Sequence, residues 1–424
     1  MDSQNFINRM ITIQNNLLDF FDNKSNSEEN IKNIFPNPQI FDDHNEFKSF
    51  LHLFVSISRY HLRKYDFFEK MDSILYFIKD HISKYFSNSE IFTIFKGNRR
   101  ILLFLTEQNI MSFDEHIAKK ILMDHKLIKR NYHRYFLPEI KSLMDDKWFK
   151  EIERESEKYY YIDTYSSVIK EMKQEVPEHF YENRRIAENE NRICLLIRND
   201  LIKEFVQYVT INKTKLSLVM DQSIYEIDVL GDRYERRKRS SLIEYAAFFG
   251  SVKIFNYLLM NNCKLTPSLW SCAFHSGSPY IINILKENQI QPKYETFENI
   301  FINSIKYHNN KITNYILVNL LSNEVKELEK NCLKKSLNFF NYDFMQDFLN
   351  VNNNDLLDFL CKYDHYTFID DILKKNETNY MNTKFLFSAI DKENIEIIKL
   401  LLSKVNLNLN EKKILNYNIL IIFL

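Results

Sequence analysis

Glycine and proline are scarce in this sequence, and their scarcity excludes several classes of protein. The 424 residues include only 4 glycines and 7 prolines. Sheets with tight turns and glycine-rich phosphate loops need more of both residues. The patterns GxxxxGK, GxGxxG, HExxH and GxSxG, which mark nucleotide sites, zinc proteases and serine hydrolases, do not occur. We therefore expect an all-α protein that is not an enzyme, with no cofactor, no metal and no small-molecule substrate.

The sequence also lacks an excess of charge and a targeting segment. Its 57 basic residues are balanced by 57 acidic ones, whereas proteins that bind nucleic acid or membrane surfaces need a positive field. The first residues do not form a basic stretch followed by an apolar one, and no uncharged apolar run reaches the roughly 18 residues that a membrane span needs. We expect a protein partner, no membrane span and a cytoplasmic location, with the nucleus as the alternative.

Candidates for metal or acid–base chemistry are few. The five cysteines include no CxxC pair and are expected to be free thiols of a reducing compartment. Cys272 and His275 lie three residues apart on a predicted helix, but no second ligand lies near them, so a place in the core or along a groove is favoured over half a metal site. A second polar cluster is interpreted as surface: Asp114, His116, Asp124 and His125.

What the sequence does contain is a helical hairpin. Hydrophobic residues make up 45% of the chain, which is enough for a buried core. Over residues 241–259, two adjacent alanines precede Gly250, and apolar residues follow at Ile254, Phe255, Leu258 and Leu259. This spacing predicts a short helix, a turn at Gly250 and a second short helix. A hairpin of roughly 18 residues cannot bury a core alone, so copies of it are expected.

Copies do follow, at intervals of about 30 residues. With Gly250 as the turn position, the same spacing places later turns at Gly277, His308, Phe340, Asp364 and Glu393. The residue four before the turn is small except at Leu360, and it is expected to let neighbouring first helices approach closely. Gly97 marks an isolated copy, and residues 191–209 form a weak one. Glycine accepts positive φ without steric cost, so the turns that lack it, from His308 onward, are expected to be looser and less regular.

These residues carry a resemblance. The segment Leu242 to Gly250, followed by Ile254 and Leu258-Leu259, is similar to the ankyrin repeat. The chain resembles an ankyrin-repeat family, expanded in protozoa, in which an uncharacterised helical N-terminal region precedes the repeats. Residues 192–200, 241–250 and 265–270 carry this narrower resemblance. The usual Thr-Pro-Leu-His opening is absent, and Thr266-Pro267-Ser268-Leu269 is the nearest approach to it. The resemblance implies an α-solenoid of stacked repeats that acts as an interaction module, with no activity assigned.

The copies give the expected domain organisation. It consists of an N-terminal helical region (1–88), a helical region with one degenerate repeat (89–190), a weak repeat with a basic loop (191–240), the repeat array (241–405) and an incomplete terminal repeat (406–424). Solenoids need a polar terminal cap, whereas residues 412–424 are apolar, so self-association through this end is possible on sequence grounds.

In an ankyrin-like array, the residues five, two and one before each turn are expected to line a concave binding face. The candidates for partner binding are Tyr245, Phe248, Phe249, His275, Lys306, Tyr307, Asn338 and Phe339. For Phe248 and Phe249, packing against the neighbouring repeat is the alternative. The basic run at 233–239 supports an alternative function, a nuclear or nucleic-acid-associated adaptor, although a solvated inter-repeat loop is the default interpretation of the run.

Overall fold

The computed structural model is mostly helical, which confirms the expected all-α class. It describes residues 3–64, 66–143, 168, 170–227, 240–292, 297–321, 326–346, 353–374, 383–390 and 394–404. Within these ranges the strands are β1 (Val219–Met220) and β2 (Ser240–Ser241), which pair antiparallel. The basic run at 233–239, the terminal segment 406–424 and the turn predicted at Glu393 lie outside the described residues. None of the described helices combines the length and hydrophobicity that crossing a bilayer requires.

The chain forms two compact units. Residues 57–296 make the continuous unit, and residues 1–56 together with 297–424 make the discontinuous unit. This division differs from the sequence-based boundaries, because the predicted array 241–405 is shared between the two units. The first 56 residues, expected to belong to a separate N-terminal region, fold with the later helix pairs instead.

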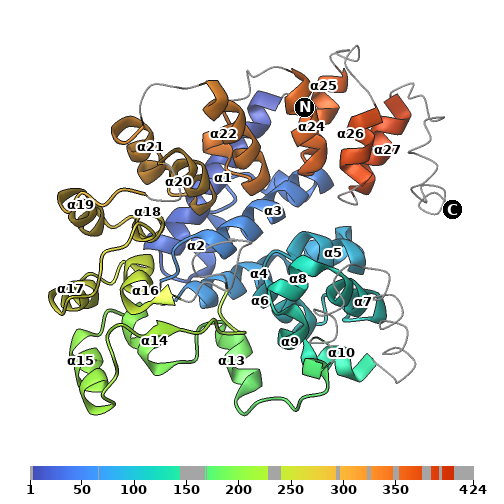
Figure 1. Ribbon diagram of the computed structural model, residues 1–424. Helices are drawn as coiled ribbons and strands as arrows, with labels where there is room; N and C mark the ends of the chain where they lie inside the picture. Colours follow the sequence, from blue (N-terminus) through green and yellow to red (C-terminus); the bar gives the residue numbers. More distant parts are fainter. Residues whose placement is uncertain are drawn as a thin grey trace. The chain divides into compact units, whose positions relative to one another are not determined.

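The continuous unit begins with a group of helices and continues with three helix pairs (Figure 1). The first group comprises α4 (Phe67–Tyr85), α5 (Asn88–Phe95), α6 (Arg99–Glu107), α7 (Glu115–Met123), α8 (His125–Lys129), α9 (Tyr132–Tyr135), α10 (Leu137–Leu143) and α13 (Phe180–Ile186). The pairs are α14 (Arg192–Arg198) with α15 (Ile202–Ile211), α16 (Leu242–Phe249) with α17 (Val252–Met260), and α18 (Leu269–Ser276) with α19 (Pro279–Glu287).

The discontinuous unit combines N-terminal helices with four further pairs. The N-terminal elements are α1 (Ser3–Asn23), α2 (Glu28–Lys32), η1 (Pro38–Phe41) and α3 (His44–Tyr60), of which α3 belongs to this unit up to Ser56. The pairs are α20 (Phe297–Ser304), extended by η2 (Ile305–Tyr307), with α21 (Asn310–Asn319); α22 (Lys326–Phe339) with α23 (Tyr342–Gln346); α24 (Asn353–Lys362) with α25 (Tyr366–Lys374); and α26 (Thr383–Ile390) with α27 (Ile395–Lys404).

A left-handed residue separates the two helices of most pairs. The φ angle is 69° at Gly250, 63° at Gly277, 55° at His308, 54° at Phe340 and 63° at Asp364. These predicted turn positions are therefore confirmed, and Asp200, with φ of 49°, fixes the register of the weak copy. Gly97 lies between two short helices, α5 and α6, as the isolated copy predicts, but among the described glycines positive φ occurs only at Gly250 and Gly277. Between α5 and α6 the chain turns instead with Lys96 in the right-handed region and Asn98 capping α6.

Helix α3 contacts the bulky residues that occupy the glycine-free turns at His308, Phe340 and Asp364. Its polar row, Lys48, His52 and Ser56, is spaced by four residues and so lies on one face of the helix. Lys48 Nζ lies 2.6 Å from Asp364, the His52 ring stacks on Phe340 with centroids 4.8 Å apart, and Ser56 Oγ lies 3.2 Å from His308 Nε2. Left-handed backbone costs about 1 to 2 kcal/mol in a non-glycine residue, and these contacts offset that cost.

Helix α1 packs beside the same pairs (Figure 1). The Phe6 ring meets Tyr342 and Phe368 edge-on, at centroid distances of 6.0 and 5.3 Å. Gln14 is fully buried; it donates to Asn341 at 3.1 Å and accepts from the Tyr342 amide at 2.8 Å. Helix α1 therefore anchors the N-terminal ends of α23 and α25.

One hydrogen bond recurs between consecutive pairs. In each bond, the residue that follows the turn of one pair donates a side-chain hydrogen to a backbone carbonyl of the preceding pair. That carbonyl belongs to the residue three positions before the turn of the preceding pair. These bonds are Ser251 to Ile197 at 2.5 Å, Asn341 to Ile305 at 2.9 Å, His365 to Leu337 at 2.9 Å and Asn394 to Cys361 at 2.9 Å. The last carbonyls of a helix lack intrahelical partners, so in these four places a pair caps the first helix of its predecessor. We call this series the capping ladder.

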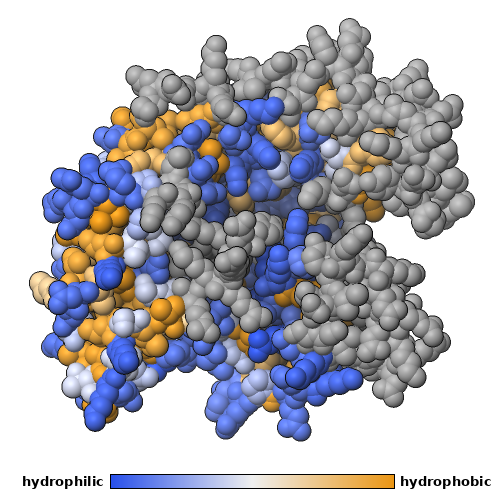
Figure 2. Space-filling model, viewed as in Figure 1, coloured by the Kyte–Doolittle hydropathy of each residue, from blue (hydrophilic) through white to orange (hydrophobic). Residues whose placement is uncertain are grey.

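The first helices of consecutive pairs also pack on one another, α14 to α16 to α18 in one unit and α20 to α22 to α24 to α26 in the other. The residues four before the turns are all buried, including Leu360. The second helices are more exposed. Polar and apolar residues alternate over α15, α17 and α19 in Figure 2, and exposed apolar side chains such as Met260 and Ile211 are single residues of the kind found on most protein surfaces.

Replacing Gly250 by alanine tests the turn geometry. We expect Gly250→Ala to lower the free energy of unfolding by about 1 to 2 kcal/mol, because an alanine at positive φ is strained. The new Cβ would also lie 3.3 Å from Ser276 Cβ. Gly97→Ala is the matched control, and we expect it to change stability by less than about 0.5 kcal/mol. Equal effects of the two variants in urea denaturation would contradict the assignment of the turn.

Candidate functional site

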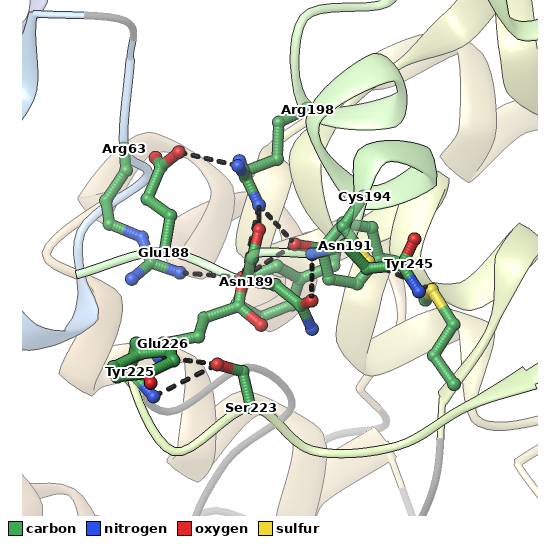
Figure 3. A network of polar contacts seen from close by, with 12 residues as sticks. Arg63, Glu188, Asn189, Asn191, Cys194, Arg198, Ser223, Tyr225, Glu226 and Tyr245 are labelled. Atoms are coloured by element: carbon green, nitrogen blue, oxygen red, sulfur yellow. Dashed lines mark hydrogen bonds and ion pairs between the residues drawn. The ribbon is translucent and has the colours of Figure 1, made fainter. Parts of the chain in front are cut away.

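A buried polar arrangement in the continuous unit surrounds the carboxylate of Glu226 (Figure 3). We call it the glutamate network; its members are Arg63, Glu188, Arg198, Glu226 and Tyr245. They come from distant parts of the unit: the segment after α3, the segment between α13 and α14, the end of α14, the segment after β1 and the middle of α16. The network therefore joins five segments that sequence patterns do not connect.

The contacts in the network are short and specific. The Tyr245 hydroxyl donates to Glu226 Oε1 at 2.6 Å, and the same carboxylate oxygen lies 3.7 Å from Arg63 and 3.9 Å from Arg198. Arg198 also donates to the Tyr245 hydroxyl at 3.0 Å and pairs with Glu188 at 2.7 Å. Two guanidinium groups thus face two carboxylates, so the charges of the network balance.

Burial governs the protonation of these groups. The side chains of Arg63, Arg198 and Glu226 are only 5 to 6% exposed. Burial raises the pKa of Glu226 above its usual value, and the neighbouring Arg63, Tyr245 and Arg198 oppose that rise. Burial also raises the pKa of Tyr245 well above 10, with the Glu226 charge adding to it. The tyrosine therefore stays protonated at neutral pH and remains a donor to the carboxylate.

The segment that carries Glu226 is fixed by further bonds. Arg99 donates to the Glu226 backbone carbonyl at 2.6 Å. Ser223 accepts from the amides of Tyr225 and Glu226, at 3.0 and 3.4 Å, and donates to Glu190 at 2.5 Å. Both the backbone and the side chain of Glu226 are therefore held in place.

The network is built to hold the fold together. The carboxylate of Glu226 is buried, and its oxygen Oε1 already faces the Tyr245 hydroxyl and the guanidinium groups of Arg63 and Arg198. The nearby Cys194 is no nucleophile, because burial raises the pKa of its thiol to about 12, and only the thiolate reacts. A partly desolvated acid or base facing a cavity would be needed for proton transfer. We interpret the glutamate network as a structural clamp.

The predicted partner-binding residues of the continuous unit are all buried. Tyr245 belongs to the glutamate network. The Phe248 ring stacks on His275 with centroids 3.6 Å apart, and His275 Nδ1 lies 2.9 Å from the Phe248 carbonyl oxygen. The Arg63 guanidinium lies 5.7 Å from the centre of the Phe249 ring. The surroundings of Phe248 and Phe249 fit the alternative given for them, packing inside the array. Because Tyr245, Phe248, Phe249 and His275 are buried, they do not form an open binding face in this unit.

In the discontinuous unit the candidates divide into two groups. Lys306 and Tyr307 are buried, with 8% and 9% of their surface exposed. Asn338 and Phe339 are half-buried at the end of α22. Burial therefore leaves Asn338 and Phe339 as the most accessible of the eight predicted residues.

The two polar clusters weighed on sequence grounds have structural roles. Cys272 Sγ lies 3.5 Å from the Ser268 carbonyl oxygen, and His275 Nδ1 lies 2.9 Å from the Phe248 carbonyl oxygen, so both buried side chains contact backbone carbonyls. Asp114 caps helix α7, and Asp124 caps helix α8. No group of three or more His, Cys, Asp or Glu side chains in the described ranges is placed to hold a metal ion. All five cysteines are described, and none forms a disulfide.

Sequence reasoning missed two features, the glutamate network and the α3 polar row. The network has no local pattern, because Arg63 and Glu226 are separated by more than 160 positions. The α3 row did leave a signal: Lys48, His52 and Ser56 form a polar line, spaced by four residues, on a helix that is mostly buried. Such a line on a buried helix requires polar partners elsewhere in the chain.

The chain matches no protein-family model and no curated protein, and the structure resembles no solved one. The chain is a mostly helical protein whose helix pairs share left-handed turns and a capping ladder. Its continuous unit contains the buried glutamate network, which we interpret as a structural clamp.

Proposed function

We propose that this chain is a non-enzymatic scaffold of ankyrin-like repeats that acts by binding another protein. The observation that carries the proposal is the capping ladder. The same side-chain position caps the preceding pair in four places, with Ser, Asn, His and Asn as donors. A contact that survives changes of residue type marks a repeated unit, and stacked repeats present rows of equivalent positions to a partner.

The binding face proposed here is narrower than the one predicted from sequence. In the continuous unit the candidate positions are filled by packed aromatic rings and by the glutamate network. In the discontinuous unit, residues near the ends of α22 and α24 are half-buried and can contribute surface to a partner. Aromatic side chains within a polar surround are the usual anchors of protein interfaces.

Affinity capture tests the proposal. The immobilised full-length chain is incubated with a lysate of its own cells, and recovered proteins are quantified against an immobilised, unrelated helical protein of similar size. We expect a small set of proteins to be enriched by at least about ten-fold, which corresponds to roughly 1.4 kcal/mol of preferential binding. No enrichment over the unrelated protein would contradict a scaffold function.

A further inference from the structure

A pocket of about 340 Å³ lies beside strand β1 in the continuous unit, and we call it the β1 pocket. Residues 218–223, which include β1, contribute most of its lining, and the other lining residues are 189–191 and Cys194. The lining combines buried side chains with exposed ones. The buried residues are Asn189, Cys194, Met220 and Ser223, and the exposed ones are Glu190, Asn191, Leu218, Val219, Asp221 and Gln222. The β1 pocket is therefore open to a partner.

The pocket follows the backbone edge of β1 rather than one of its faces. Successive side chains of a strand point to opposite faces, so a hollow on one face would be lined by every second residue. All six residues from 218 to 223 line the β1 pocket. Among the described residues β1 pairs with β2 alone. The pocket therefore lies along the edge of β1 that β2 does not cover.

The backbone of β1 offers hydrogen-bonding groups at this edge. Val219 pairs with Ser241, and Met220 pairs with Ser240. In an antiparallel ladder, residues that exchange hydrogen bonds with the partner strand alternate with residues whose backbone groups point away from it. Neither Val219 nor Met220 makes a backbone hydrogen bond to another described residue outside the ladder. One of the two therefore presents an N–H and a carbonyl that a further strand can pair with.

The lining also defines the charge of an occupant. It contains the carboxylates of Glu190 and Asp221, and its described residues include no lysine or arginine. The Ser223 hydroxyl donates to one oxygen of Glu190 at 2.5 Å and so fixes that carboxylate at the pocket. Leu218 and Val219, which are 38% and 45% exposed, offer apolar contact beside these charges. This combination favours a chain that carries basic side chains.

We infer that the β1 pocket binds an extended, basic segment of a partner protein, which joins β1 and β2 as a third strand. Main-chain hydrogen bonds to an open strand edge give affinity in such complexes, and the side-chain contacts give specificity. The carboxylates of the lining oppose the phosphates of a nucleic-acid strand. This inference rests on the proposed scaffold function and names a site and a partner chemistry for it.

The first test uses the full-length chain and a fluorescent eight-residue peptide of alternating lysine and valine. Strand pairing uses the N–H groups of alternate residues, and a slip of one residue moves the lysines to the other face. We therefore expect N-methylation of one residue type to weaken binding at least about ten-fold, and N-methylation of the other to change it less than about three-fold. Peptide binding should also slow hydrogen exchange at residues 218–223.

The second test changes the charge of the pocket. We expect Glu190→Gln/Asp221→Asn to weaken binding of the unmodified peptide at least about five-fold, with a smaller loss at high salt. The matched control is Glu204→Gln/Glu287→Gln, which removes two exposed carboxylates of the same unit outside the pocket. Both double variants are compared with the parent by circular dichroism and unfolding midpoint. If the pocket variant does not fold, the peptide isomers still decide the question on the unaltered chain.

Three results would overturn the inference: equal binding of the two N-methylated isomers, equal losses in the two double variants, or exchange protection that excludes residues 218–223. Capture from lysate separates the inference from the scaffold proposal. Equal recovery of partners by the parent and by Glu190→Gln/Asp221→Asn would reject the β1 pocket as their binding site and leave the scaffold function standing. No recovery by the parent would reject the scaffold function.

Discussion

Arg198→Met is expected to lower the free energy of unfolding of the continuous unit by about 3 to 5 kcal/mol. Arg198 pairs with Glu188 at 2.7 Å, faces Glu226 at 3.9 Å and donates to Tyr245 at 3.0 Å. Methionine has a similar length but no charge, so the variant removes the ion-pair partner of Glu188 and leaves Arg63 as the remaining guanidinium near Glu226. A buried charge that loses its partner costs far more than the intact pair contributes.

The measurement is urea denaturation followed by circular dichroism, with hydrogen exchange to assign the loss to the continuous unit. Arg192→Met is the matched control because Arg192 is exposed on the same helix, α14. We expect the control to change stability by less than about 0.5 kcal/mol. If the two variants unfolded at the same urea concentration, the glutamate network would not be a clamp.

His365→Asn is expected to remove a large part of the acid sensitivity of the discontinuous unit. His365 is buried on the capping ladder, and burial lowers its pKa to about 4 in the folded chain. In the unfolded chain a histidine has a pKa of about 6.5. Between pH 6.5 and 4 the unfolded state therefore binds more protons, so stability falls as the pH is lowered through this window. The difference corresponds to roughly 3 kcal/mol once the pH reaches about 4.

Neighbouring groups titrate in a different window. Asp364, which faces Lys48 and His52, has a pKa well below its usual range because Lys48 and His52 outweigh the effect of its burial. Its contribution is present above about pH 4, the pKa of an unfolded aspartate, and is lost only as the pH falls below that value. A loss of stability that begins between pH 6 and 5 therefore reports on His365.

Asparagine is the natural replacement because Asn341 and Asn394 occupy the same ladder position in other pairs. The variant keeps a donor for the Leu337 carbonyl but loses the ring contacts with Phe340 and Phe368. We expect about 1 to 2 kcal/mol of lost stability at pH 7 and a flatter profile from pH 6.5 to 4. His116→Asn, at an exposed histidine, is the control with an unchanged profile. An unchanged slope in His365→Asn would contradict the prediction.

The repeat positions could be predicted from sequence because they follow local rules. Apolar spacing and small residues located the turns at Gly250, Gly277, His308, Phe340 and Asp364, and their left-handed backbone confirms each one. The glycine argument was valid at Gly250 and Gly277 and failed at Gly97, because glycine permits a left-handed turn without requiring one. The later turns at His308, Phe340 and Asp364 are left-handed without glycine, and at Phe340 the ring stacks on His52 of α3.

The candidate site could not be predicted to the same extent. Counting back from each turn finds the positions that an open array would expose, but it cannot show what else in the chain covers them. Tyr245 is covered because Glu226 and Arg198 reach it from distant segments. Asn338 and Phe339 remain half-buried. Such long-range packing depends on pairs of residues that carry no shared pattern.

The position of α1 beside α23 and α25 has a consequence for synthesis on the ribosome. Gln14 bonds to Asn341, a residue made 327 positions later. At about 5 to 20 residues per second, α1 must wait on the order of 20 to 60 s for its contacts to be translated. During that interval the side chain of Phe6, which the native fold packs against Tyr342 and Phe368, lacks its final neighbours. Nascent chains should therefore depend on chaperones that shield an N-terminal helix, and slowed translation should increase aggregation.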